Sequence, residues 1–151
     1  MKKIKLKDIS QSAPEKLSKE ETIIEATIHL NGNRKMDAQL VTLDIPFFIK
    51  NILKEKSWKS KDRNSITIYK TNGLSIVLVA LKKGAELTKH TADGIVALQV
   101  LKGKIIFKTE DKSVELGKRQ MIALHSGIPH SVVAKKKTIF LLTVNTEFNA
   151  K

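Results

Sequence analysis

The stretch GAELTKHTADGIVALQVLKG, from Gly84 to Gly103, contains two strand-like runs with one histidine between them. Side chains two residues apart on a strand point the same way, so a His-x-His pair delivers two imidazoles to one metal. In this chain His90 is followed two residues later by Ala92. The stretch therefore predicts a β-structured frame and leaves the chemistry at His90 open.

From Ser65 onward the chain consists of short β-branched runs separated by turn residues. The runs are SITIYK, LSIVLVAL, IVALQVL, KIIFKTE, SVEL, QMIAL, HSVVAK and TIFLLTV. Each break contains Gly, Asp, Asn or Pro, which are the residues that turns require. This pattern predicts a mainly β fold, an antiparallel barrel or jelly roll. LSIVLVAL and TIFLLTV are almost continuously apolar, which predicts burial on both faces: the barrel interior on one side and a subunit contact on the other.

The length of 151 residues predicts one domain, residues 22–151, preceded by a flexible arm, residues 1–21. Within residues 22–64, TIIEATIHL and DAQLVTL flank an Asn-Gly turn and predict two strands. Asp44 then caps one amphipathic helix that ends near Trp58. Phe47, Phe48 and Trp58 could stack on bases, but their spacing favours packing of this helix on the core.

The formal net charge of +13 raises the question of nucleic-acid binding. Only Arg34, Arg63 and Arg119 among the 28 basic residues are arginine, whereas base reading favours the guanidinium fork. The lysines are spread along the whole chain, which favours a solvated surface over specific nucleic-acid binding. No apolar run is long enough to span a membrane, and we expect a cytoplasmic protein. The absence of cysteine excludes thiolate metal sites.

Two segments, GAELTKHTADGIVALQVLKGKIIF and LGKRQMIALHSGIPHSVVA, resemble the paired motifs of the cupin superfamily, in particular its small single-domain barrels. The positions that match are Gly84, His90 and Gly103 in the first motif and Gly117, Gly127, Pro129 and His130 in the second. The resemblance covers about residues 74–144 and implies a cupin barrel that forms a homodimer.

The resemblance also implies a divalent metal held by four ligands, of which this chain retains His90 and His130. Ala92 replaces the second histidine, and the position of the family's glutamate falls on Val96. Two imidazoles make a poor metal site, because catalytic sites usually take three protein ligands. Glu86 shares strand parity with His90 but lies about 13 Å away along an extended strand.

His125 could complete the site, because the loop that follows it could fold its ring toward His130. A site of His90, His125 and His130 would suit zinc, iron, nickel or manganese. The alternative is that His125 caps a turn on the rim.

Two functions of different classes follow. In the first, the barrel binds a small molecule, with His90 and His130 as polar anchors in an apolar pocket lined by Val96, Leu98 and Val100. In the second, the chain is a metal-dependent enzyme that resembles cupin dioxygenases or isomerases. The missing ligands favour the first, and the fold alone does not decide the reaction.

Overall fold

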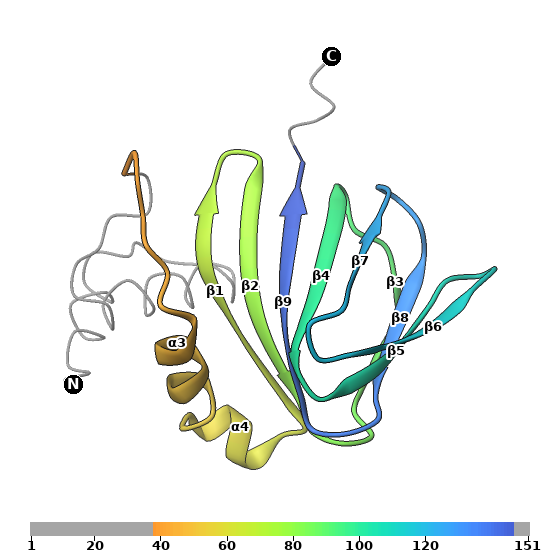
Figure 1. The fold of residues 1–151 in the computed structure, drawn as a ribbon, viewed down its shortest axis with the longest axis horizontal. Coiled ribbons are helices and arrows are strands. Elements are labelled where there is room, and N and C mark those ends of the chain that lie inside the picture. The colour runs from red at the N-terminus through yellow and green to blue at the C-terminus, as the bar shows by residue number, and fades with distance from the viewer. Residues whose placement is uncertain (1–37, 147–151) are drawn as a thin grey trace.

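The computed structural model describes residues 38–146, which form two packed antiparallel sheets and two short helices (Figure 1). One sheet has the order β1-β2-β9-β4-β7 and the other the order β3-β8-β5-β6. The strands are β1 Arg63–Thr71, β2 Leu74–Leu81, β3 Glu86–His90, β4 Ile95–Lys102, β5 Lys104–Lys108, β6 Ser113–Gly117, β7 Met121–Leu124, β8 His130–Ala134 and β9 Thr138–Asn145. All runs predicted from Ser65 onward are therefore confirmed as strands.

The main hydrophobic core fills the space between the two sheets. It takes Leu98 and Val100 from β4, Phe140 from β9, and Phe107 and Val132 from the smaller sheet. Residues along β4 are alternately buried and half-buried, as expected for a strand with one face on this core. The predicted jelly-roll architecture is confirmed, although no strand ladder closes the two sheets into a continuous barrel within residues 38–146.

Gly103 joins β4 to β5 at a position that only glycine can occupy. Its φ of +97° lies in a region that L side chains rarely adopt. A Cβ atom at this position would also overlap the carbonyl oxygen of Lys137 and the side chain of Thr138. The glycine therefore lets the β4–β5 turn approach the turn between β8 and β9.

The outer face of the larger sheet is covered by helices α3 (Ile45–Ile52) and α4 (Lys56–Ser60). Phe48 and Trp58 from these helices form a second core with Leu78 of β2 and Ile139 of β9. The predicted burial of β2 and β9 on both faces is confirmed for the last residues of β2 and the first residues of β9. On this part of the sheet the cover comes from the same chain, not from the second subunit that the sequence suggested.

The single predicted helix is wrong, because two helices occupy its place. Asp44 caps α3 as predicted, since its side chain accepts a hydrogen bond from the Phe47 backbone N–H at 3.2 Å. Where the helix ends, the Asn64 side chain on β1 donates to the carbonyl oxygen of Ile52 and to Glu55 Oε1. The chain then becomes extended at Glu55 before α4 begins.

The N-terminal predictions fall mostly outside the described residues. The arm of residues 1–21 and the predicted strand of residues 22–30 cannot be compared with the structure. The predicted return strand, residues 37–43, is wrong where the structure describes it, because residues 38–43 contain no strand. A strand requires a hydrogen-bonded neighbour, and no described strand pairs with this segment, in which Leu40 is 83% exposed.

Candidate functional site

His90 and His130 are brought opposite each other by the pairing of β3 with β8. His90 ends β3, His130 begins β8, and the two are register partners. The register shifts between Leu87 and His90, where β3 contains one extra residue. Such a bulge redirects the side chains that follow it. It places His90 beside His130, which shares its face of β8 with the core residues Val132 and Ala134.

The same bulge separates Glu86 from the histidines. Glu86 pairs with Val133, whereas its neighbour Leu87 pairs with Val132 and packs against the core. Glu86 therefore lies on the face of the sheet that points away from the core. The strand parity that Glu86 shares with His90 in the sequence does not hold in the structure.

The imidazole rings of His90 and His130 are in contact. Their centroids are 4.3 Å apart and their planes are inclined by 60°. The ring of Phe107 stacks on the ring of His130, with a centroid distance of 5.3 Å and an interplanar angle of 12°. His130 is buried, with 6% of its surface exposed, while His90 is exposed. The pair therefore spans the boundary between the core and the solvent.

Backbone carbonyl groups set the orientation of both rings. Nδ1 of His90 lies 2.7 Å from the carbonyl oxygen of Thr88, and Nδ1 of His130 lies 2.8 Å from that of Ile128. Because a carbonyl oxygen only accepts hydrogen bonds, both Nδ1 atoms are assigned as donors. In the neutral ring the lone pair is then on Nε2. Neither Nε2 atom has a hydrogen-bond partner among residues 38–146, so both can bind a ligand.

These two nitrogens do not make a complete metal site. Within residues 38–146 no group of three or more His, Asp or Glu side chains is placed to hold a metal ion. His125 lies exposed just after β7 and is not gathered with His90 and His130 into the three-histidine site considered from the sequence. The described residues therefore do not fit the divalent metal that the resemblance implies.

The apolar residues predicted to line a pocket lie in the interior of the larger sheet. Val96, Leu98 and Val100 are each at most 2% exposed. Leu98 and Val100 pack in the main core beside Phe107, the residue that stacks on His130. The described cavity is lined by none of these three residues.

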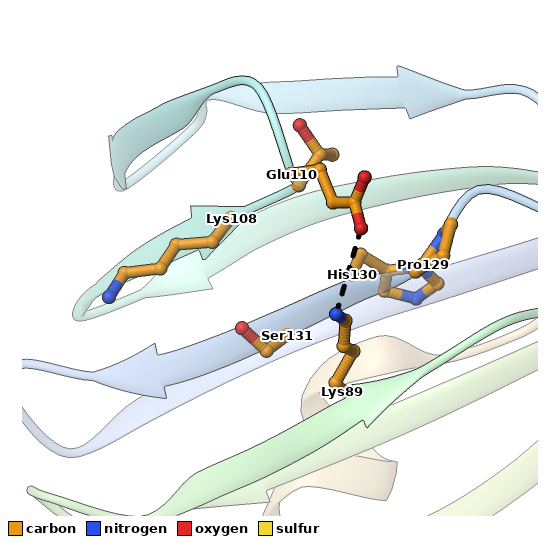
Figure 2. A pocket seen from close by; sticks show the side chains of 7 residues that line it. Lys89, Lys108, Glu110, Pro129, His130 and Ser131 are labelled. Carbon is orange, nitrogen blue, oxygen red and sulfur yellow. Dashed lines mark ion pairs between the residues drawn. The ribbon is translucent and has the colours of Figure 1, made fainter.

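A cavity of about 150 Å³ adjoins the site and is lined by His130 (Figure 2). Its walls come from β3, β8, the end of β5 and the segments next to these strands. The other lining residues are Lys89, Lys108, Thr109, Glu110, Pro129 and Ser131. Figure 2 shows Lys89 and Glu110 reaching toward each other across β8, with Lys89 Nζ 3.8 Å from Glu110 Oε2.

The cavity carries more positive than negative charge. Lys89 and Lys108 contribute two ammonium groups, against the single carboxylate of Glu110. The Lys89–Glu110 pair is long and more than half exposed, so it holds its partners weakly. Lys108 has no ion-pair partner among residues 38–146. Ser131 and Lys108 alternate with His130 and Phe107 on their strands, so their side chains lie on the outer face of the smaller sheet, whereas the His130 ring faces the core side. An anionic group would therefore find cations on the outer face next to His130, and not around its ring.

Sequence reasoning did not identify this cavity. Lys108 and Ser131 are register partners on β5 and β8 and lie 23 positions apart in the chain. No local pattern reveals which residues will be paired across two strands. The one available signal was proximity in sequence, because Lys89, Pro129 and Ser131 flank the two predicted histidines.

Comparison with known proteins identifies the fold. No family model matches the chain, and no curated protein matches its sequence. Solved structures do match. A conserved protein of unknown function from Streptococcus pyogenes is 22% identical, with a TM-score of 0.56 over 74% of this chain and 92% of that one. A cupin superfamily protein from Desulfitobacterium hafniense is 15% identical, with a TM-score of 0.59 over 74% and 96%.

An enzyme shares the same architecture. The salicylate 1,2-dioxygenase of Pseudaminobacter salicylatoxidans is 14% identical, with a TM-score of 0.65 over 77% of this chain and 38% of the enzyme. At these identities the similarity concerns the fold and not the activity. It agrees with the two antiparallel sheets of the described residues. The chain therefore has the fold of the cupin superfamily.

Proposed function

We propose that this protein binds a small anionic molecule, with His90 and His130 as polar anchors. The Nε2 lone pair of a neutral ring cannot donate to an anion, so each ring that contacts the anion takes up a proton at Nε2 when the ligand binds. The observation that carries the proposal is the pair of oriented rings whose Nε2 atoms have no partner among residues 38–146. The Nδ1 hydrogen bonds fix both rings before a ligand arrives, which reduces the entropy lost on binding. The stack of Phe107 on His130 restricts that ring further.

The adjoining cavity supports an anion in preference to a neutral ligand. Lys89, Lys108 and the Ser131 hydroxyl can donate to an anion in the cavity on the outer face of the sheet, and the two charges attract an anion toward the histidines. A ligand anion would compete with Glu110 for Lys89, and the exposed ion pair offers little resistance. The volume suits a compact ligand such as a short dicarboxylate.

The test is an NMR titration of the histidine ring resonances with malonate, inorganic phosphate and neutral glycerol. We expect saturable shifts of the His90 and His130 signals with at least one anion and none with glycerol. His125, which is exposed and outside the cavity wall, serves as the internal reference. Lys108→Ala should weaken the anion by about fivefold or less, since Lys108 acts from the outer face through an exposed charge, which is worth roughly 0–1 kcal/mol.

The matched control is Lys70→Ala, which removes an exposed lysine at the end of β1 in the other sheet. It should leave the anion affinity unchanged. Equal weakening by both variants would show that net charge alone attracts the anion, and the absence of saturable shifts would refute the proposal.

Metal analysis of the untagged protein separates this proposal from a metal-dependent enzyme of the dioxygenase or isomerase type. The binding function predicts well under one metal per chain. A full equivalent that is lost on His125→Ala would show that His90, His125 and His130 come together in solution, and would favour the enzyme.

A further inference from the structure

Segments that carry lysines and lie far apart in the sequence meet at one end of the two-sheet fold, and Figure 1 shows the segments. Four segments meet there: helix α4, the β2–β3 turn, the β4–β5 turn and the β8–β9 turn. We call their lysines the lysine end: those of α4 and those at residues 82–83, 102–104 and 135–137. Most of these side chains are exposed.

Backbone hydrogen bonds hold the turns of the lysine end together. The N–H of Lys135 donates to the carbonyl oxygen of Lys104 at 2.8 Å, which joins the β8–β9 turn to the β4–β5 turn. The N–H of Gly84 donates to the carbonyl oxygen of Ala134, also at 2.8 Å, which joins the β2–β3 turn to the end of β8. The lysines are therefore placed by the strand ladders and not by chance contacts of flexible side chains.

The indole of Trp58 connects α4 to the same surface. Lys82 Nζ lies 5.1 Å and Lys137 Nζ 6.0 Å from the centre of the Trp58 ring. Both distances are in the range of cation–π contacts. Two ammonium groups from separate turns are thus held beside one buried aromatic ring.

Few carboxylates neutralise this surface. The ion pairs among residues 38–146 are Arg63–Asp62 and Lys89–Glu110, and neither includes a residue of the lysine end. Asp62 lies close by, but it accepts from Arg63, and that hydrogen bond lowers the pKa of Asp62, with a smaller contribution from the charge of Lys82. An anionic partner would therefore reduce the electrostatic repulsion among these lysines.

The composition of the surface favours nucleic acid over a membrane. Apart from Leu40, the large exposed apolar side chains of residues 38–146 are Val114, Met121 and Ile128, and all four lie outside the lysine end. An amphipathic membrane-binding surface inserts apolar side chains, and this one has none to insert. The lysines offer point charges without the guanidinium fork that reads bases.

We propose that the lysine end binds the sugar–phosphate backbone of nucleic acid without regard to base sequence. The binding is separate from the small-molecule site, because the histidine pair lies at the opposite ends of β3 and β8 from the turns that form the lysine end. Lysine–phosphate contacts release counterions, so the affinity should fall steeply with salt.

The test is fluorescence anisotropy of the full-length protein with a labelled single-stranded DNA and a duplex of scrambled sequence. We expect the affinity to drop about a hundredfold between roughly 50 and 200 mM salt if about four phosphates are neutralised. The affinities of two unrelated sequences of the same length should agree within a factor of about three, since phosphate contacts carry no base information.

A pair of charge-reversal variants makes the test specific to the surface. Lys83→Glu/Lys136→Glu changes two exposed lysines of the lysine end, whereas Lys70→Glu/Lys112→Glu makes the same change of net charge at the other end of the hairpins β1–β2 and β5–β6. The first variant should bind at least tenfold more weakly, with a slope of log K against log salt smaller by about two. The second should bind like the unmodified protein.

Three outcomes would overturn the proposal. No binding at low salt would refute it directly, and equal weakening by the two variants would assign the binding to net charge instead of the lysine end. Binding to vesicles rich in phosphatidylserine, without binding to either nucleic acid, would assign this surface to a membrane.

Discussion

Ala92 stands where the metal-binding motif that the sequence resembles has its second histidine. It stands two positions after His90, in the loop beyond β3, and its carbonyl oxygen accepts a hydrogen bond from the Gly127 N–H at 3.0 Å. We expect Ala92→His to raise zinc occupancy, because a third imidazole would join His90 and His130. The measurement is the zinc content of untagged protein after equilibration with zinc and desalting.

The control for this prediction is Thr91→His, which adds a histidine at the neighbouring exposed position. It should leave the zinc content at the level of the unmodified chain. A similar rise in both variants would mean that the added imidazole binds zinc without the histidine pair. Adding His130→Ala to Ala92→His should return occupancy to the starting level.

At the scale of elements, one buried amide anchors the end of α3 on β1. Asn64 is 9% exposed and donates to the carbonyl oxygen of Ile52 at 3.0 Å and to Glu55 Oε1 at 2.9 Å. Asn64→Ala would leave the end of the helix without this donor, so we expect a loss of about 1–3 kcal/mol in the free energy of unfolding. Chemical denaturation followed by tryptophan fluorescence reports directly on Trp58, the only tryptophan.

Ser60→Ala is the matched substitution on the other helix. Its hydroxyl donates to the carbonyl oxygen of Lys56 at 3.0 Å, but the bond is exposed and water can replace it. Its removal should change the free energy of unfolding by less than about 0.5 kcal/mol. If both substitutions cost the same, the Asn64 amide does not determine the docking of α3.

At the scale of the whole molecule, we propose a homodimer formed through the larger sheet. Helices α3 and α4 cover the part of this sheet near the end of β2 and the start of β9, but Leu74 and Ile76 on β2 and Leu141 on β9 stay partly exposed. Such an apolar strip is suited to pairing with a second copy. Light scattering at micromolar concentration should give the mass of two chains.

Ile76→Glu tests the proposed contact surface. A charge on this strip should shift the mass toward one chain, because it would be buried without a partner in the interface. Val114→Glu, on an exposed position of the smaller sheet, should leave the mass unchanged. A monomeric unmodified protein would contradict the proposed dimer.

Within residues 38–146, no helix is long and apolar enough to cross a membrane.

Local patterns in the sequence were sufficient to predict the strands from Ser65 onward and the Asp44 cap. Two local signals predicted these strands: the alternation of apolar residues within each run and the turn residues between runs. Both depend on residues a few positions apart, and the tertiary contacts of the fold agree with them. The motif glycines and the two histidines, matched to a known pattern, predicted the cupin fold and placed His90 near His130.

The tertiary structure alone decided four features: the bulge in β3, the end of α3 at Asn64, the cavity beside His130, and the lysine end. Each depends on which residues meet across strands or turns that lie far apart in the chain. Lysines that are spread along the sequence meet at one end of the fold, because antiparallel strands return their alternate turns to the same side. Neither residue type nor spacing contains that information before the strand register is known.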